Sequence, residues 1–191
     1  MIIGITGGSG CGKTTLLEVI SSCGGLVLDC DRIYHELLRT DKELIGRIES
    51  RFPDVVEQGI LNRKKLGNLV FSDEKALNDL NQITHTYVKK AVMLALKENP
   101  PLAAIDAIGL FEGGLAKLCD VTVAVIAPEE QRVSRLMKRD HIPADYAKKR
   151  ILAQRPQKEF AEICDYTLEN NGDIELFRNS CLAFLRQLDI I

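Results

Sequence analysis

The segment Gly7–Thr14 carries the clearest chemistry in this chain. Its sequence, GGSGCGKT, fits the pattern G-x-x-x-x-G-K-[ST] at every fixed position. Glycines let the backbone turn so that successive N–H groups face the oxygens of a phosphate. In this pattern Lys13 reaches the β- and γ-phosphates, and the hydroxyl of Thr14 can ligate magnesium. We expect a nucleoside triphosphate to be bound by Gly8, Ser9, Gly10, Cys11, Gly12, Lys13, Thr14 and Thr15.

The loop needs a strand before it and a helix after it, and the sequence predicts both. Residues 2–5 form an apolar run that is typical of a buried strand, and apolar residues at 16, 17 and 20 recur at helical spacing. The N-terminus of that helix adds the positive end of its dipole to the phosphate site. Because this strand–loop–helix order distinguishes the segment from a chance glycine-rich turn, we predict nucleotide binding.

Two acidic residues follow the next predicted strand. Residues 26–28 form a short apolar run, and Asp29 and Asp31 come directly after it. Because the carboxyl ends of parallel strands meet at the edge that carries the phosphate loop, both carboxylates are expected beside the nucleotide. There they could orient an acceptor hydroxyl, take its proton or hold magnesium through water. Asp31 could instead only cap a helix over residues 32–38.

A third carboxylate, Asp106, ends the strand predicted over residues 102–105. It is expected at the same edge, where it would hold magnesium together with Thr14. The alternative is a carboxylate at a strand–loop junction with no role in the reaction. Glu112 is a weaker candidate of the same kind. His85 lies on the polar side of a predicted helix, where exposure to solvent explains it as well as a ligand contact does.

Residues 131–158 are strongly basic. They hold nine lysines and arginines against two aspartates, which gives this segment a net charge of +7. Arg135 and Arg139 share one face of a predicted helix, and Arg150 lies on the next helical stretch. The segment could be a solvated surface, or a mobile lid that lays guanidinium groups over the phosphates. The nearby phosphate loop favours the lid.

Alternating strands and helices predict an α/β fold with a parallel sheet. Further strands are predicted over residues 121–126 and 166–168. The last helix carries apolar residues on one face: Ile174, Phe177, Cys181, Phe184 and Leu188. From residue 31 to about 98 no strand pattern is convincing, and residues 74–96 predict one long amphipathic helix. A helical insertion between the second and third strands is typical of a substrate cap.

Composition bounds the function further. The 191 residues include 25 basic and 27 acidic side chains, a formal net charge of −2, which argues against a nucleic-acid partner. Apolar runs are far shorter than the roughly 20 residues of a membrane span, and no secretory signal opens the chain. We expect a cytoplasmic protein, monomeric or weakly homo-oligomeric, with no membrane partner.

The cysteines show no metal-ligand or disulfide spacing. There are six, and no two of them form a C-x-x-C pair. We expect reduced thiols that fill small core spaces. Cys11 could differ, because a helix N-terminus and a lysine lower a thiol pKa and favour attack by oxidants. It could also be only a small residue within the loop.

Several segments together resemble the dephospho-coenzyme A kinase family. The phosphate loop is generic among them, whereas the other segments are more specific. They keep the family's order over nearly the whole chain: residues 29–31, 61–66, 70–71, 81–85, 109–112, 131–139, 149–154 and 165–172.

The resemblance implies ATP-dependent phosphorylation of the ribose 3′-hydroxyl of dephospho-coenzyme A, the last step of coenzyme A synthesis. It implies a three-layer P-loop kinase fold, with a parallel sheet flanked by helices, a helical substrate-binding insertion and a helical lid. Residues 1–30, 100–137 and 161–191 would form the nucleotide-binding core, residues 31–99 the substrate domain and residues 138–160 the lid.

The resemblance also assigns roles by position. Asp31 would activate the acceptor, and the other catalytic residues would be Lys13, Arg139 and Arg150. Substrate binding would fall to Asp29, Asp31, Arg63, His85 and Glu112. Asn170 and Asn171 would form part of the ATP site around the adenine, and ATP and Mg²⁺ are the implied small molecules.

The chain departs from the family at two places. The family often has proline after the histidine and a Pro-Leu-Leu run before Phe-Glu. Here Thr86 takes the first place, and Ile108 and Gly109 lie in the second. The first change affects how the long helix bends, and the second removes a leucine side chain near the substrate.

Two other functions remain open from the residues alone. A nucleoside or nucleotide kinase would use the same loop and lid. A GTPase-type switch would explain the D-x-x-G match at residues 106–109. However, the lysine of its guanine-reading motif is missing from residues 170–173. A binding module without turnover would leave the acidic pair and the arginines without a task.

Overall fold

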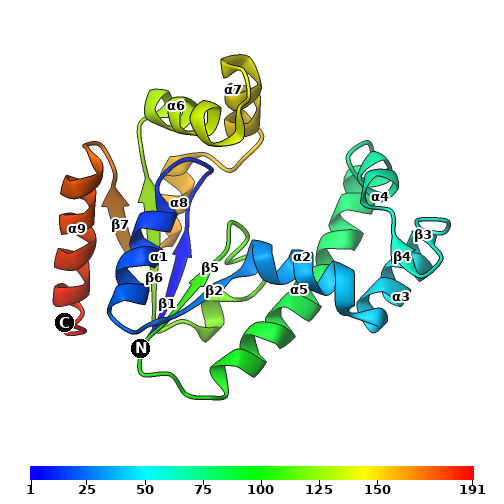
Figure 1. The fold of residues 1–191 in the computed structure, drawn as a ribbon, viewed down its shortest axis with the longest axis horizontal. Coiled ribbons are helices and arrows are strands. Elements are labelled where there is room, and N and C mark those ends of the chain that lie inside the picture. Colours follow the sequence, from blue (N-terminus) through cyan, green and yellow to red (C-terminus); the bar gives the residue numbers. More distant parts are fainter.

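A five-stranded parallel sheet forms the centre of the computed structural model, which describes all residues 1–191. The strand order is β2-β5-β1-β6-β7, and each neighbouring pair runs parallel (Figure 1). The strands are β1 (Ile2–Thr6), β2 (Leu26–Asp29), β5 (Ala103–Asp106), β6 (Val121–Ile126) and β7 (Tyr166–Glu169). The predicted α/β class and parallel sheet are confirmed.

The register of the sheet places the predicted acidic residues at one level. Asp29 of β2 is the Cα partner of Asp106 of β5, which is also the partner of Ile5 in β1. The phosphate loop begins one residue after β1 ends at Thr6. The carboxyl ends of these strands therefore bring the loop and two carboxylates to one edge of the sheet.

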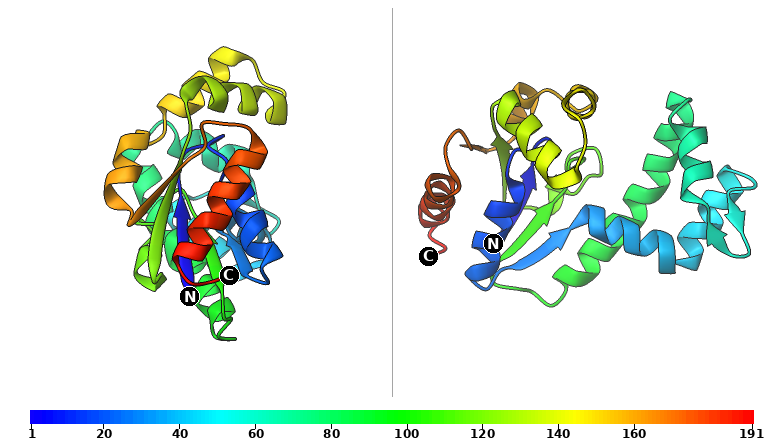
Figure 2. Two further views of the ribbon diagram at one scale, coloured as in Figure 1. Left: turned by 90° about the vertical axis from the view of Figure 1, so that its left-hand side faces the viewer. Right: turned by 45° about the horizontal axis from the view of Figure 1, so that its top comes forward.

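Two hydrophobic layers cover the faces of the sheet. Helices α1 (Lys13–Ser22) and α9 (Ile174–Gln187) lie on one face and share a core cluster with Ile3, Ile5 and Val123 of the strands (Figure 2). On the other face, Val88 and Val92 of α5 (Glu74–Leu96) belong to a cluster that includes Ile105. Full burial of such side chains contributes about 1.5–3 kcal/mol each, which fixes the sheet that carries the loop.

The insertion forms a helical arm beside the sheet. It comprises α2 (Cys30–Thr40), α3 (Lys42–Arg51), the hairpin β3 (Val56–Glu57) and β4 (Ile60–Leu61), α4 (Arg63–Val70) and α5. The arm extends away from the sheet (Figure 1) and has a hydrophobic cluster of its own, which includes Leu44, Ile48 and Val55. The hairpin was not predicted, because two-residue strands are too short to show a periodic pattern.

The basic segment folds as two packed helices and a third short one. Helices α6 (Glu129–Asp140) and α7 (Ala144–Leu152) share a small apolar cluster, and α8 (Gln157–Ile163) packs against β6. The turn between α6 and α7 holds His141 at φ 53°, in the left-handed region. The α6–α7 pair lies over the carboxyl edge of the sheet (Figures 1 and 2).

Most predicted elements match the structure. The helix over residues 74–96, the strand over residues 121–126 and the helix start after Pro128 have the predicted bounds. The prediction that Ile174 lies on the buried face of α9 was wrong, because this side chain is 61% exposed and the core contacts of the helix begin at Phe177. A short 3-10 turn, η1 (Ala116–Leu118), precedes β6. None of the helices combines the length and apolar character that a membrane span needs.

Candidate active site

The phosphate loop depends on glycine at several positions. Gly7, Gly10 and Gly12 have φ angles of 139°, 79° and 107°, which other residues rarely adopt. A Cβ atom at Gly7 would also lie 2.3 Å from the carbonyl oxygen of Val125. The glycine spacing in the sequence therefore reflects both backbone conformation and close packing.

The carbonyl oxygens of the loop are held by side chains from distant parts of the chain. Arg132 Nε donates to the carbonyl of Ser9 (3.0 Å), Arg135 Nη1 to that of Gly10 (3.1 Å) and Asn170 Nδ2 to that of Cys11 (2.9 Å). Helix α1 has no side-chain cap at its N-terminus. The amides of Gly10, Gly12, Lys13 and Thr14 donate to no other group of the protein, so they are free for a ligand.

Lys13 lies between the loop and the acidic edge. Its Nζ donates to the carbonyl of Gly7 (2.9 Å) and is 4.0 Å from Oδ1 of Asp106. Both side chains are largely buried, at 14% and 17% exposed. The ammonium group is therefore placed where a bound triphosphate would need its charge.

The surroundings of Asp106 disfavour the charged form of its carboxyl group. Burial raises its pKa to about 6, the charge of Lys13 opposes this, and the charges of Asp29 and Asp31 add to the rise. Its Oδ1 is buried and has no hydrogen-bond partner. A carboxylate oxygen in this state suits a cation, because a positive charge would offset the cost of burial.

Asp29 and Asp31 have different roles in the structure. Oδ1 of Asp29 accepts a hydrogen bond from the amide of Arg32 (3.0 Å), so Asp29 is the N-cap of α2. Asp31 lies within the first turn of that helix, is exposed and has no protein partner. The alternative that Asp31 caps the helix is wrong, because Asp29 does so. Asp31 is left free to meet a substrate.

A cavity of about 420 Å³ opens beside Asp31, between α2, α4, α5 and the segment after β5. Twelve of its twenty lining residues are hydrophobic. Its polar lining includes Asp31, Arg63 and His85. The cavity thus brings together three residues that the sequence analysis had assigned to substrate binding or catalysis.

The polar groups of this cavity have few fixed partners. Nη2 of Arg63 lies 2.9 Å from Nδ1 of His35. Burial lowers the pKa of His85, and the charge of Glu112 partly opposes the shift. Around Gly109 there is room, since a Cβ atom would meet only Glu112 and His85, both at 3.8 Å. The missing leucine side chain at Gly109 leaves part of this space open.

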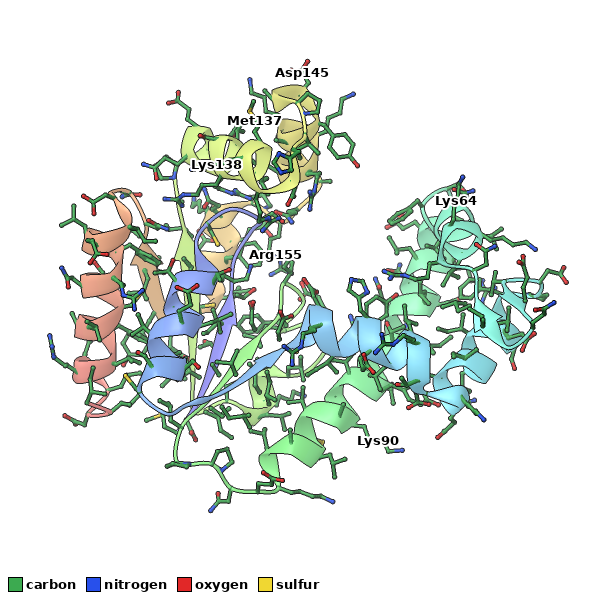
Figure 3. All side chains as sticks on the ribbon, viewed as in Figure 1. Lys64, Lys90, Met137, Lys138, Asp145 and Arg155 are labelled. Atoms are coloured by element: carbon green, nitrogen blue, oxygen red, sulfur yellow. The ribbon has the colours of Figure 1, made fainter.

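Glu112 faces the lid side of the site rather than the cavity interior. Its Oε1 accepts a hydrogen bond from Nη2 of Arg155, which belongs to the segment that joins α7 to α8 (Figure 3). This ion pair connects the lid segment to the acceptor side. Glu112 is not among the residues that line the cavity.

Arg139 and Arg150 do not reach the phosphate loop in this structure. Both bind Asp140, through Arg139 Nε to Oδ1 (2.7 Å) and Arg150 Nη1 to Oδ2 (2.6 Å). These two partners hold the pKa of Asp140 well below its usual range. The arginines that contact the loop are Arg132 and Arg135. Helical spacing puts Arg132 on the face of Arg135 and Arg139, a signal that the sequence analysis counted only as charge.

Of the two predicted adenine-site residues, Asn170 is buried and Asn171 is exposed. Asn170 is 4% exposed. Its side-chain Nδ2 donates to the carbonyl of Cys11, and its Oδ1 accepts from Nη2 of Arg135. The side chain of Asn171 bonds Glu169, and its backbone oxygen accepts from Gln131. The structure therefore uses Asn170 to hold the loop.

The hypothesis of a reactive Cys11 thiol is wrong. Cys11 is fully buried and belongs to the core cluster beneath the loop. Burial raises the pKa of the thiol and outweighs the opposing effect of Lys13. The backbone amide of Lys13, at the N-terminus of α1, also favours the thiolate, but its effect on the pKa is smaller than that of burial.

Comparison with known proteins decides the family. A family model described as dephospho-CoA kinase matches residues 1–175. A dephospho-CoA kinase of Carboxydothermus hydrogenoformans is 33% identical over 192 residues, covering 97% of this chain and 93% of that protein. The chain belongs to the dephospho-CoA kinase family. It is thus related to kinases that transfer phosphate to a hydroxyl group.

Solved structures share the fold of this chain. A crystal structure from Thermus thermophilus has a TM-score of 0.83 at 35% identity, covering 98% of this chain and 97% of that chain. A shikimate kinase from Bacteroides thetaiotaomicron has a TM-score of 0.60 at 16% identity over 99% and 98% of the two chains, and shares the fold alone. These neighbours confirm the P-loop kinase fold.

Membership of the dephospho-CoA kinase family removes the GTPase alternative. The D-x-x-G match at residues 106–109 has another explanation in the structure. Asp106 faces Lys13, and Gly109 lines the cavity beside Asp31. The two residues serve different parts of one kinase site rather than a switch.

The buried state of Cys11 leads to a labelling prediction. Iodoacetamide at neutral pH should modify the partly exposed Cys23 of the folded protein and leave Cys11 unmodified. After unfolding in urea both cysteines should react, which controls for digestion and detection. Peptide mass spectrometry gives the readout. Labelling of Cys11 in the folded protein at the rate of Cys23 would show that its thiol is accessible.

Proposed function

We propose that this protein transfers the γ-phosphoryl group of ATP to the ribose 3′-hydroxyl of dephospho-CoA, giving CoA and ADP. This is the last step of coenzyme A synthesis. The observation that carries the proposal is the placement of Asp31. This unpartnered carboxylate lines a largely apolar cavity that opens at the same sheet edge as the free amides of the phosphate loop. Family membership supplies the identity of the acceptor.

The reaction follows from this placement. The 3′-oxygen of the acceptor attacks the γ-phosphorus, a new oxygen–phosphorus bond forms, and the bond from that phosphorus to the β–γ bridging oxygen breaks. Asp31 accepts the proton of the hydroxyl group, and ADP leaves with the electron pair of the broken bond. Because phosphoryl transfer is loose, orientation of the hydroxyl by Asp31 contributes together with proton removal.

The donor side of the site holds the triphosphate. The free amides of Gly10, Gly12, Lys13 and Thr14 donate to the phosphate oxygens, and the ammonium group of Lys13 neutralises the charge of these oxygens. Gly8, Ser9, Cys11 and Thr15 form the rest of the loop around the phosphates. Thr14 and Asp106 are the residues that would hold Mg²⁺. The orphaned oxygen of Asp106 fits a cation, and no larger cluster of acidic, histidine or cysteine ligands competes for one. When bound, magnesium supplies positive charge to the β- and γ-phosphates.

The acceptor side is the helical arm. We assign residues 31–99 to acceptor binding and residues 1–30, 100–137 and 161–191 to the nucleotide-binding core. Arg63 and His85 contact the acceptor from α4 and α5, where both line the cavity. Asp29 acts through the helix that it caps, and Glu112 through its ion pair with Arg155.

Residues 138–160 act as the lid. Arg139 and Arg150 are 60% and 39% exposed and share Asp140 as their counter-ion. Phosphate oxygens can replace Asp140 as the partner of these arginines, because phosphate also accepts paired hydrogen bonds from a guanidinium group. Asn171, which is exposed near the start of α9, stays available to the adenine, while Asn170 fixes the loop.

A substrate panel tests the acceptor. With Mg-ATP the purified protein should consume dephospho-CoA and add one phosphoryl group, which mass spectrometry should locate on the ribose 3′-oxygen. GTP as donor, and adenosine or shikimate as acceptor, should give little product. Turnover of adenosine comparable to that of dephospho-CoA would show that the protein is a nucleoside kinase instead.

A pair of matched variants tests Asp31. Asp31→Asn should lower kcat by about 10²–10⁴, the usual contribution of a positioned general base. Asp29→Asn should lower it far less, because asparagine is as good an N-cap as aspartate. Both proteins should unfold at the wild-type urea midpoint. An Asp31→Asn protein that is folded and fully active would remove this residue from the mechanism.

A further inference from the structure

Arg132 of α6 is a buried cation without an acidic partner. The residue is only 3% exposed, and burial lowers the pKa of its guanidinium group. Nε donates to the carbonyl of Ser9 (3.0 Å) and Nη2 to Oε1 of Gln154 (3.2 Å), both of which are neutral acceptors. The charge of Glu129 in the same helix favours the guanidinium cation, but the two residues form no ion pair. A buried charge that lacks a counter-ion is costly, so this one suits a bound anion.

The guanidinium lies over the first half of the phosphate loop. A Cβ atom built at Gly8 would be only 2.2 Å from Nη2 of Arg132, which places this nitrogen directly against the loop backbone. Nζ of Lys13, the group that reaches the β- and γ-phosphates, bonds the neighbouring carbonyl of Gly7. The Gly7–Ser9 end of the loop is therefore the end of the terminal phosphate.

The side chain of Gln154 bonds both Ser9 and Arg132 at this end of the loop. Its Oε1 accepts hydrogen bonds from both the amide of Ser9 (2.8 Å) and Nη2 of Arg132 (3.2 Å). Its Nε2 donates to Oγ of Ser9 (2.7 Å). A backbone amide and a guanidinium that converge on one oxygen form a donor set typical of phosphate recognition.

We propose that Arg132 is a catalytic residue that contacts the terminal phosphate of ATP, and that Oε1 of Gln154 occupies the position of a phosphate oxygen until ATP arrives. Arg132 then neutralises charge on the transferring group, as arginines do in other phosphoryl-transfer sites. This role is additional to those of Arg139 and Arg150. The inference rests on the proposed function only for the identity of the phosphate donor.

Replacement of two arginines separates this role from loop support. Arg132→Gln keeps a donor for the Ser9 carbonyl but removes the charge. It should weaken ATP binding by about tenfold or more, the value of a charge-assisted hydrogen bond, and ADP binding by less than about threefold. With dephospho-CoA, kcat should fall by about 10²–10³. Calorimetry with Mg²⁺ and no acceptor gives both affinities.

Arg135→Gln is the matched control. Arg135 bonds the carbonyls of Gly10 and Cys11 and the buried Asn170, so its loss loosens the loop for any nucleotide. The affinities for ATP and for ADP should therefore fall by the same factor. If Arg132→Gln also lowers the affinities for ATP and ADP by the same factor, Arg132 only supports the loop and the proposal is overturned.

A second variant keeps the proposal testable if Arg132→Gln does not fold. Gln154→Glu places a carboxylate against Arg132, and this carboxylate should compete with the terminal phosphate. The affinity for ATP should therefore fall by about tenfold or more, and the affinity for ADP by less than about threefold. Gln187→Glu adds the same charge at an exposed position in the last turn of α9, so both affinities should stay within about threefold. Wild-type affinity of Gln154→Glu for ATP would contradict the proposal.

The binding measurements also distinguish this inference from the proposed function. They need no acceptor, so selective loss of ATP affinity supports Arg132 whichever hydroxyl receives the phosphate. Failure of the wild-type protein to phosphorylate dephospho-CoA would refute the acceptor and leave the role of Arg132 intact. Equal effects on ATP and ADP would refute Arg132 and leave the acceptor intact.

Discussion

A phosphate loop can offer its amides to a ligand only while its carbonyl oxygens are held by other groups. In this protein the carbonyls of Ser9, Gly10 and Cys11 are bonded by Arg132, Arg135 and Asn170, respectively. Glycines with positive φ angles complete the conformation. Each buried carbonyl that lost its partner would cost about 1–3 kcal/mol, so the conformation of the loop depends on α6 and on the turn after β7.

The parallel sheet then determines how the donor and the acceptor meet. Asp29 and Asp106 are register partners at the ends of adjacent strands, and β1, which leads into the loop, lies next to β5. Asp29 caps α2, and this cap fixes the start of the helix that carries Asp31. One edge of the sheet thus brings an unpartnered carboxylate, a buried acidic group and a row of free amides together.

Local patterns predicted much of this arrangement. Three patterns each lie within a short stretch of sequence and each predict an element that the fold contains. They are the glycine spacing of the loop, the 3.6-residue period of α5 and the apolar run of β6. The contacts that hold the loop were not predictable in this way. Ser9 and Gln154 are 145 residues apart and Cys11 and Asn170 are 159 residues apart, so no local pattern links them. The division of roles between Asp29 and Asp31 depends on where α2 begins, and the state of Cys11 depends on which way its side chain points. Neither is a property of spacing.

The most direct test of the central claim is a comparison of amide NMR spectra without and with Mg-ATP. Amides that receive phosphate oxygens move strongly downfield, because a charged acceptor polarises the N–H bond. We expect the largest shifts at Gly10, Gly12, Lys13 and Thr14, whose amides have no protein partner. Large shifts confined to another part of the chain, with these four amides unchanged, would show that the triphosphate binds elsewhere.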